Sequence, residues 1–421
     1  MTDTHIHPPE GFSLWSREFI DDPYAMYRRM HAELPGFWDG GSWVLARYAD
    51  VQAALRDPRL SSERIDPDPA WLEQSGLEPL YSAHQHMMLF TDPPDHTRLR
   101  GLVNKAFTPR AVEQMCTTIQ QLVDDMITTA DNGRIDLIND FAYPLPVTVI
   151  ASMLGVPVDQ REQFKRWSEP IAAFIGGTTG PEEQMMAEAQ QAVIELGAYF
   201  RDMAARRRRE PQDDLLTAMA LAEEQGDRLS TDELTANLIL LLVAGHETTT
   251  NLIGNGMLAL LQNPDQLALL RERPDLIGNA VEELLRFDSP VQGTSRKAKQ
   301  DLTIGPYAIK AGQHVQVMIG AANHDPLQYN DPDRLDITRN DVRHLSFAHG
   351  PHFCVGAPLA RLEGQIAIST LIRRLPNLAL TDEPLDWRDN FTLRGLRRLP
   401  RTFDSADHRL PDRPGAANRQ H

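Results

Sequence analysis

A cysteine between two glycines is the residue of this chain best suited to ligate a metal. Cys354 lies between Gly350 and Gly356, just before a segment of helical periodicity that begins at Leu359. A helix N-terminus presents unpaired N–H groups and the positive end of the helix dipole. Both lower the pKa of a thiol and favour the metal-binding thiolate. The alternative is a small apolar side chain buried in a loop. For Cys116, which lies inside a helical pattern, our interpretation is likewise a packing residue without a ligand.

An acid and a run of hydroxyl side chains directly follow the longest apolar run of the chain. Glu247 and Thr248 belong to the segment 244–250, which extends the run 238–244. Gly245 leaves room above a helix for a ligand or a kink, and Thr248 can bond the carbonyl one turn back. Because a buried carboxylate is costly, the alternative is a helix that emerges into solvent at this point.

Two further pairs combine charges on one helix face. His96 and Arg100 stand at i and i+4, where two donors suit an anionic group such as a carboxylate. Glu283 and Arg286 stand at i and i+3 and can form an ion pair. The alternatives are a solvated basic face for the first pair and a weak surface ion pair for the second.

The elements that must position these residues are mostly helices. Apolar spacing of i, i+3 and i+4 predicts a largely helical region from 109 to 270, and Ser230 with Glu233 forms a capping box that opens a helix there. The helices predicted from this spacing cover 112–130, 159–174, 182–209, 213–224, 274–287 and 359–375. Strand-like composition marks 43–48, after the hairpin signal Asp39-Gly40-Gly41, and the segments 302–304 and 314–319. The predicted fold class is therefore mainly α with minor β.

Composition narrows the chemistry further. Lys and Arg number 42 against 59 Asp and Glu, and the net charge of −17 disfavours nucleic acid and anionic membranes as partners. Two cysteines exclude a disulfide framework and any zinc or iron–sulfur site that needs several thiolates. Such cysteine usage is typical of a reducing compartment, so we expect a cytoplasmic protein. No Gly-x-Gly-x-x-Gly stands between a strand and a helix, so we expect no nicotinamide or flavin domain.

In order and separation, these segments resemble those of the cytochrome P450 family, the haem-thiolate monooxygenases. They read His-x-x-x-Arg from His96, Ala-Gly-x-Glu-Thr from Ala244, Glu-x-x-Arg from Glu283, and Phe-x-x-Gly-x-His-x-Cys-x-Gly from Phe347. The sequence is similar to those of the soluble bacterial subgroup that oxidises polyketides, macrolides and fatty acyl chains. The resemblance implies one haem-centred domain over 1–403, with a flexible tail over 404–421.

The resemblance also implies roles for individual residues. Cys354 would be the axial thiolate ligand of the iron of haem b. Glu247 and Thr248 would face the oxygen site, with O2 as co-substrate, Thr248 donating a hydrogen bond and Glu247 relaying protons. The remaining haem-binding residues would be His96, Arg100, Ala244, Gly245, Arg296, Phe347, His352 and Gly356, with the two propionates held by His96, Arg100, Arg296 and His352. Glu283 and Arg286 would form a structural network with Arg334 behind the haem.

Substrate and partners follow from the same resemblance. The implied reaction inserts one oxygen atom from O2 into a C–H bond of a hydrophobic small molecule, with electrons from NAD(P)H delivered by a ferredoxin reductase and ferredoxin. The candidate substrate contacts are Leu89, Phe174, Leu241, Val291, Thr294 and Leu393. The candidate cations of a ferredoxin-docking patch are Arg100, Lys105, Arg110 and Arg361. We expect a monomer.

Two positions depart from the family pattern, and two other functions stay open. Ala348 replaces a usual glycine and, because alanine disfavours positive φ, is expected at negative φ. His324 replaces a usual arginine in Asn323-His324-Asp325-Pro326. The alternatives to a monooxygenase are a peroxide-driven relative of the same fold, which typically lacks the acid–alcohol pair, and a non-catalytic haem carrier or gas sensor.

Overall fold

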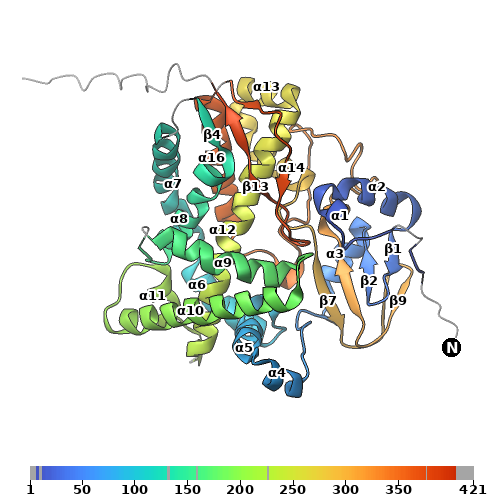
Figure 1. The fold of residues 1–421 in the computed structure, drawn as a ribbon, viewed down its shortest axis with the longest axis vertical. Helices are drawn as coiled ribbons and strands as arrows, with labels where there is room; N and C mark the ends of the chain where they lie inside the picture. The colour runs from blue at the N-terminus through green and yellow to red at the C-terminus, as the bar shows by residue number, and fades with distance from the viewer. Residues whose placement is uncertain are drawn as a thin grey trace, which may run out of the picture.

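Helices make up most of the molecule; one group of short strands lies along one side, and other short strands lie among the helices (Figure 1). A computed structural model describes residues 6–8, 12–129, 133–157, 160–224, 227–375 and 377–403. This arrangement confirms the predicted class, mainly α with minor β. The predicted tail 404–421 lies outside the described residues. Among the described residues, no helix is both long and apolar enough to cross a membrane.

The longest helix, α12 (Thr231–Gln262), runs through the middle of the helical part (Figure 1). Its first turn carries the predicted capping box, in which Ser230 and Glu233 bond each other's backbone N–H groups. Nearly every residue from Leu234 to Leu260 is buried, because apolar side chains lie on all faces of this helix. The helices α5 (Glu78–His86), α8 (Pro144–Met153), α9 (Arg161–Gly176), α10 (Glu182–Arg209), α14 (Ile277–Phe287) and α16 (Ala357–Arg374) pack around it.

Other helices complete this part and the N-terminal side. They are α1 (Arg17–Asp21), α2 (Pro23–Glu33), α3 (Tyr48–Arg56), α4 (Pro69–Ser75), α6 (Asp95–Ala106), α7 (Pro109–Thr129), α11 (Leu215–Leu221), α13 (Pro264–Glu272) and α15 (Ile319–Ala322). Short helical turns of other pitch occur at η1 (Met88–Phe90), η2 (Leu137–Ala142), η4 (Pro274–Leu276) and η5 (Gly350–His352). One large hydrophobic cluster spans the helical part, and two smaller clusters lie beneath the sheet and α2.

A five-stranded sheet forms the other side of the molecule. Its order is β1-β2-β10-β7-β3, with β2 and β10 parallel and the other neighbours antiparallel. The strands are β1 (Gly36–Trp38), β2 (Ser42–Leu45), β3 (Leu60–Ser61), β7 (Thr294–Ala298) and β10 (His314–Val317). The predicted hairpin turn at residues 39–41 joins β1 to β2, and Asp39 accepts hydrogen bonds from the N–H groups of Gly41 and Ser42.

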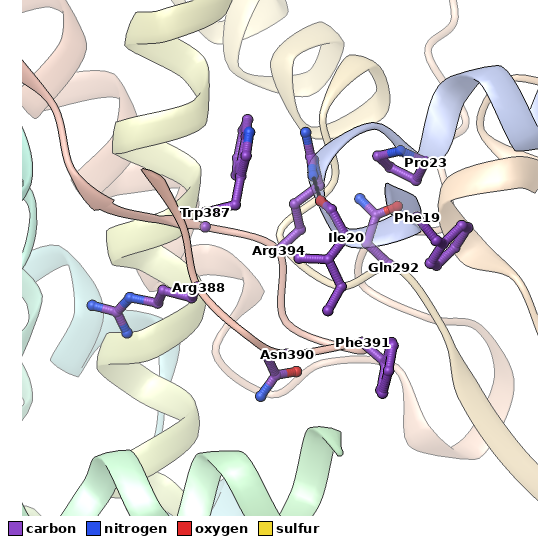
Figure 2. A pocket seen from close by; sticks show the side chains of 10 residues that line it. Phe19, Ile20, Pro23, Gln292, Trp387, Arg388, Asn390, Phe391 and Arg394 are labelled. Carbon is purple, nitrogen blue, oxygen red and sulfur yellow. Dashed lines mark hydrogen bonds between the residues drawn. The ribbon is translucent and has the colours of Figure 1, made fainter. Parts of the chain in front are cut away.

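The remaining strands form small sheets. They are β4 (Arg134–Asp136), β5 (Glu223–Glu224), β6 (Asp227–Arg228), β8 (Leu302–Ile304), β9 (Tyr307–Ile309), β11 (Ala379–Leu380), β12 (Asp386–Trp387), β13 (Leu396–Arg398) and β14 (Pro400–Thr402). β12 pairs with β13, and the loop 388–395 between them reaches into the helical part towards α12 (Figure 2).

Several predicted elements have different ends in the structure. The predicted strand 43–48 stops at Leu45 and Tyr48 opens α3, whereas the strand 314–319 stops at Val317 and Ile319 opens α15. The predicted helix 213–224 is only α11, followed by the hairpin of β5 and β6. In each case the pattern of apolar residues continues past the point where tertiary packing turns the chain.

The other predicted helices agree with the structure to within a few residues. The helix 182–209 is α10 at both ends, and 359–375 is α16, displaced by two residues at its start. The helix 274–287 begins with the 3₁₀ turn η4 before α14. The helices 112–130 and 159–174 are α7 and α9, and their predicted end at 130 and start at 159 lie outside the described residues.

Candidate active site

The cysteine segment is a tight loop held by backbone hydrogen bonds. The N–H of Ala348 donates to Leu345 O at 2.7 Å, and that of Cys354 donates to Phe347 O at 3.0 Å. Ala348 has φ of 58°, so the prediction of negative φ is wrong. The turn back to Leu345 requires the left-handed conformation that glycine adopts without strain. Alanine occupies it at a cost of about 1–2 kcal/mol.

Burial governs the pKa of the Cys354 thiol. Burial raises this pKa above its ordinary value, and the N–H groups of Gly356 and Ala357 and the charge of Arg100 offset only part of the increase. The sequence-based expectation of a lowered pKa was therefore wrong for the thiol alone, because desolvation outweighs the helix N-terminus. A bound metal cation adds the positive charge that deprotonates such a thiol.

A strip of α12 faces open space although the helix is otherwise buried. Ala244 is exposed, and Gly245 and Thr248 are partly exposed, between long buried stretches of the same helix. Thr248 Oγ1 donates to Ala244 O at 2.8 Å, as predicted from the spacing. Leu241, two turns before Thr248, shares this face through its i, i+3, i+4, i+7 relation to the strip. An exposed stripe within a core helix indicates an internal cavity beside it.

Gly245 also serves the packing of two helices. A Cβ at this glycine would lie 3.1 Å from Cγ1 of Ile150 on α8. The missing side chain therefore permits the close approach of α8 and α12, while the residue itself borders the open strip.

Glu247 is buried and held by an arginine that the sequence analysis missed. Arg388 Nη1 donates to Glu247 Oε2 at 2.6 Å, and His246 Nε2 lies 3.4 Å from Glu247 Oε1. Figure 2 shows the Arg388 side chain directed from the loop 388–395 towards α12, away from Arg394. Burial raises the pKa of Glu247, but Arg388 and His246 outweigh burial and bring this pKa to about 2. The acid is therefore ionised at neutral pH.

His246 lies within the same network. Its Nδ1 is 2.7 Å from Leu242 O, and its Nε2 is 3.1 Å from Ser168 Oγ on α9. Tyr143 packs edge-on against the ring, and burial together with the charge of Glu247 raises the pKa of this tyrosine. The acid on α12 is thus connected to α8, α9 and the loop 388–395.

The four residues expected to bind propionates lie close together. The rings of His96 and His352 are 4.0 Å apart between centroids, and His352 Nε2 is 2.9 Å from Ser62 Oγ. Burial lowers the pKa of both histidines and the charge of Arg296 adds to this effect, with a pKa of about 3 for His352. The charge of Arg100 also lowers the pKa of His96 and acts on Cys354.

The network around Glu283 differs from the prediction in one member. Arg286 forms a bidentate pair with Glu283 at 2.8 Å, and both side chains are fully buried. The side chain of Arg334 is 61% exposed and pairs with Asp336, while only its backbone oxygen accepts a bond from Arg286. Arg339 is the third member and second cation of this network, with Nε 3.3 Å from Glu283 Oε1. The assignment of Arg334 to this network is therefore corrected.

The arginine missing from the segment 323–326 is replaced by a buried histidine. His324 Nδ1 lies 2.9 Å from Asp333 Oδ1, and His324 Nε2 lies 2.9 Å from Phe287 O at the end of α14. The histidine therefore joins the loop that follows α15 to the helix of Glu283, so the departure leaves this region connected.

The expected substrate residues form two groups. Phe174 on α9 packs edge-on against His84, whose ring stacks on Phe90 beside Leu89. Asn237 of α12 anchors this turn, accepting from Met88 N at 2.9 Å and donating to His86 O at 2.9 Å. Val291 and Leu393 meet in an isolated β-bridge. Thr294 opens β7, beside Arg296, and Leu241 faces the open side of α12.

The predicted docking patch contains fewer surface cations than expected. Arg361 is paired with both carboxylate oxygens of Glu282, at 2.6 and 2.8 Å, and Arg100 acts on the Cys354 thiol from the interior. Lys105 and Arg110 remain exposed near the end of α6 and the start of α7.

The donor set fits one haem. Cys354 offers the single thiolate that haem iron requires, and no group of three or more His, Cys, Asp or Glu in the described ranges could hold a metal ion. Arg100 and Arg296 form no ion pair of 4.0 Å or less with a described carboxylate, so they can receive two propionates. The open strip of α12 supplies the space.

Comparison with known proteins decides the family. The family model described as Cytochrome P450 matches residues 12–277 and 275–389. The chain belongs to the cytochrome P450 family. It is 46% identical to Cytochrome P450 107B1 of Saccharopolyspora erythraea over 91% of this chain and 95% of that one. It is 39% identical to the 6-deoxyerythronolide B hydroxylase of the same organism, over 93% and 98%.

A solved structure agrees with these relatives. P450BioI in complex with hexadec-9Z-enoic acid ligated acyl carrier protein superposes with a TM-score of 0.86, at 39% identity, over 92% of this chain and 99% of that one. The relatives are named as P450 enzymes and hydroxylases, so this P450 is an oxygenase that uses haem and O2.

Proposed function

We propose that this P450 inserts one oxygen atom from O2 into a C–H bond of a hydrophobic small molecule, using electrons from a ferredoxin. The observation that carries the proposal is the acid–alcohol pair of α12, where Thr248 borders the open strip and Glu247 is held ionised behind it. The substrate class we propose is a polyketide or macrolide, a fatty acid, or a terpenoid or steroid. The similarity to a 6-deoxyerythronolide B hydroxylase and to a P450 solved with an acylated acyl carrier protein supports the first two classes.

Haem b would be held by Cys354 as axial ligand and by His96, Arg100, Arg296 and His352 at its propionates. When bound, the haem supplies O2 activation and the oxidation of the C–H bond. Phe347 and Gly356 flank the cysteine on either side, and Ala244 borders the open strip. Cationic and hydrogen-bonding partners for both propionates offset the cost of burying two carboxylates.

The chain itself controls protons at this site. Thr248 can exchange its bond to Ala244 O for one to a ligand in the open space, since both need only rotation about one bond. Glu247, ionised and linked to Arg388 at the rim of the loop 388–395, is a proton acceptor that connects the interior with that loop. This pair supports proton delivery as the chain's contribution.

We propose that the electron donor docks near the thiolate side, at Lys105 and Arg110. Both are exposed at adjoining ends of α6 and α7. Replacing Arg110 with Ala should slow reduction by ferredoxin and reduce the dependence of that rate on salt, because charge pairs mainly change association rates. A reduction rate that is the same in the variant as in the wild type and does not depend on salt would overturn the assignment of this docking patch.

Two other functions are separated by direct measurements. A non-catalytic carrier or gas sensor usually needs no thiolate, so an absorption spectrum of the reduced, carbon-monoxide-bound protein without a red-shifted thiolate-type Soret band would overturn the proposal. A peroxide-driven relative typically lacks the acid–alcohol pair found here. Turnover with peroxide exceeding turnover with ferredoxin, reductase and NAD(P)H would favour that alternative.

A further inference from the structure

Arg64 is a partly buried arginine that the site described so far does not use. It follows β3 and reaches inwards, where Nη1 donates to Ser295 O on β7 at 3.2 Å. Its guanidinium carbon lies 4.6 Å from the centre of the Phe90 ring. The bond to Ser295 O is the one hydrogen bond of the guanidinium to the described residues, and it leaves most of the five N–H donors for a ligand.

The charged neighbours of Arg64 are cations. Burial and the charge of Arg296 together lower the pKa of Arg64 to about 9. Arg64 in turn lowers the pKa of His84, His314 and His352. No carboxylate in the described part of the chain lies within 4.0 Å of its guanidinium. A largely desolvated cation without an anion is costly, so this arrangement indicates an anionic ligand.

The haem cannot neutralise this charge. Iron(III), the porphyrin dianion and the Cys354 thiolate together carry no net charge, which leaves only the two propionates as anions. Arg64, Arg100 and Arg296 bring three cations to the same region. The carboxylate whose charge reaches Arg296 is that of Asp92, which is already paired with Lys299 at 3.2 Å. With Arg100 and Arg296 assigned to the propionates, Arg64 remains as one positive charge in excess.

The surplus charge lies on the substrate side. Phe90, which Arg64 contacts, also stacks against His84 at 3.6 Å between ring centres, and Phe174 packs on the same histidine at 5.9 Å. His84 is 4% exposed, and its Nε2 has no hydrogen-bond partner among the described residues. An unsatisfied buried nitrogen beside aromatic rings marks a place where a polar part of a ligand can bind.

We propose that Arg64 binds the carboxylate of an amphipathic substrate whose apolar chain lies against Phe90 and Phe174, so that the preferred substrate class is a long-chain free carboxylic acid. This inference rests on the proposed function, and it selects one of the substrate classes given there. A guanidinium binds a carboxylate through two parallel N–H donors, and the adjoining aromatic rings bury the chain. The anchored carboxylate then fixes which carbon of the chain reaches the oxygen site.

The test compares three ligands of equal chain length on the haem-loaded enzyme. Dodecanoic acid, dodecan-1-ol and the neutral N-acetylcysteamine thioester of dodecanoic acid are measured by equilibrium dialysis and by the substrate-induced spin-state shift. We expect the acid to bind at least tenfold more tightly than either neutral ligand, because a hydrogen bond to a charged group contributes about 1.5–3 kcal/mol. In Arg64→Met the affinity for the acid should fall to that of the alcohol, and the alcohol should be unaffected.

Matched control variants show whether the preference for the acid depends on Arg64 itself. Lys297→Met removes the same charge from β7, at a side chain whose Nζ lies 3.8 Å from Asp66 Oδ2, and should change acid binding less than twofold. Arg64→Lys should recover part of the preference for the acid. Equal binding of acid and alcohol by the wild type would overturn the proposal. So would faster haem transfer from Arg64→Met to apomyoglobin with the acid preference intact, because Arg64 would then serve a propionate.

The same experiment separates this proposal from the proposed function. If the carbon-monoxide spectrum lacks the thiolate band, the proposed function fails, whatever dialysis shows. If the band is present and the acid has no advantage, only the role of Arg64 fails.

Discussion

Removing the guanidinium that holds Glu247 should destabilise the protein in a pH-dependent way. Arg388 Nη1 lies 2.6 Å from Glu247 Oε2, and the side chain of the acid is only 4% exposed. Burial alone would raise the pKa of Glu247, so its low value of about 2 depends on Arg388 first and on His246 second. Arg388→Leu removes the larger of these two contributions.

The magnitude follows from the pKa shift. A decrease from 4.5 to about 2, at 1.36 kcal/mol per unit, corresponds to about 3 kcal/mol of stability. Because the folded-state pKa is depressed, this contribution is fully present above pH 4.5 and is lost as the pH falls to about 2. In Arg388→Leu, burial instead raises the pKa of Glu247 above its unfolded value, so the variant should lose stability as the pH rises towards 7.

The assay is urea unfolding of the haem-loaded protein at pH 7 and at pH 4.5. The difference between wild type and Arg388→Leu should be at least about 3 kcal/mol at pH 7, because the raised pKa of the unpaired carboxylate adds to the lost contribution, and smaller at pH 4.5. Adding Glu247→Gln to the variant should restore much of the loss, since no uncompensated charge then remains. Arg397→Leu is the control on the adjoining strand β13, where the pair with Asp386 is exposed and should contribute less than about 1 kcal/mol.

Two results would refute this reasoning. One is a difference below about 0.5 kcal/mol between wild type and Arg388→Leu at pH 7, which would place the pair among ordinary surface ion pairs. The other is a double variant no more stable than Arg388→Leu, which would show that the loss comes from packing rather than from the stranded carboxylate.

Three further predictions concern single side chains. Thr248→Ala should maintain oxygen consumption while product falls and peroxide rises. The control is Thr249→Ala: the Thr249 hydroxyl donates to Gly245 O, and in this variant oxygen consumption should remain coupled to product formation. Unchanged product yield in Thr248→Ala would contradict the role of Thr248. Ala348→Gly should raise the free energy of unfolding by roughly 0.5 kcal/mol, since relief of about 1–2 kcal/mol of strain exceeds the added chain entropy; a decrease in the melting temperature would contradict this. Arg339→Leu should cost about 2–3 kcal/mol and Arg334→Leu less than about 1 kcal/mol in urea unfolding, with equal costs as the contrary result.

Local features of the fold were predictable from local patterns. The helix at 182–209 has the predicted bounds because its amphipathic spacing is continuous, and the capping box at Ser230 needs only side chains three residues apart. The ends of two predicted strands, where Tyr48 and Ile319 begin helices instead, were not predictable in this way. Each residue continues an apolar pattern, but packing of the sheet against α3 and α15 turns the chain there.

The backbone strain at Ala348 was also not predictable from the sequence. An alanine in place of glycine predicts a negative φ, because alanine itself prefers negative φ. The loop around Cys354 imposes the opposite sign at Ala348, since the bonds to Leu345 O and Phe347 O close the turn. A preference of about 1–2 kcal/mol is smaller than what several loop contacts impose together.

The sequence by itself determined the chemistry available to this protein: one thiolate at a helix start, an acid–alcohol pair on an apolar helix, and paired charges at helical spacing. Only the tertiary structure decided which arginine meets which anion. Arg388, from a distant segment, pairs with Glu247, Arg339 replaces Arg334 beside Glu283, and Arg64 meets no carboxylate among the described residues. The physical reason is that helical spacing fixes neighbours within a turn, whereas ion pairs between distant segments depend on distance and burial in the folded chain.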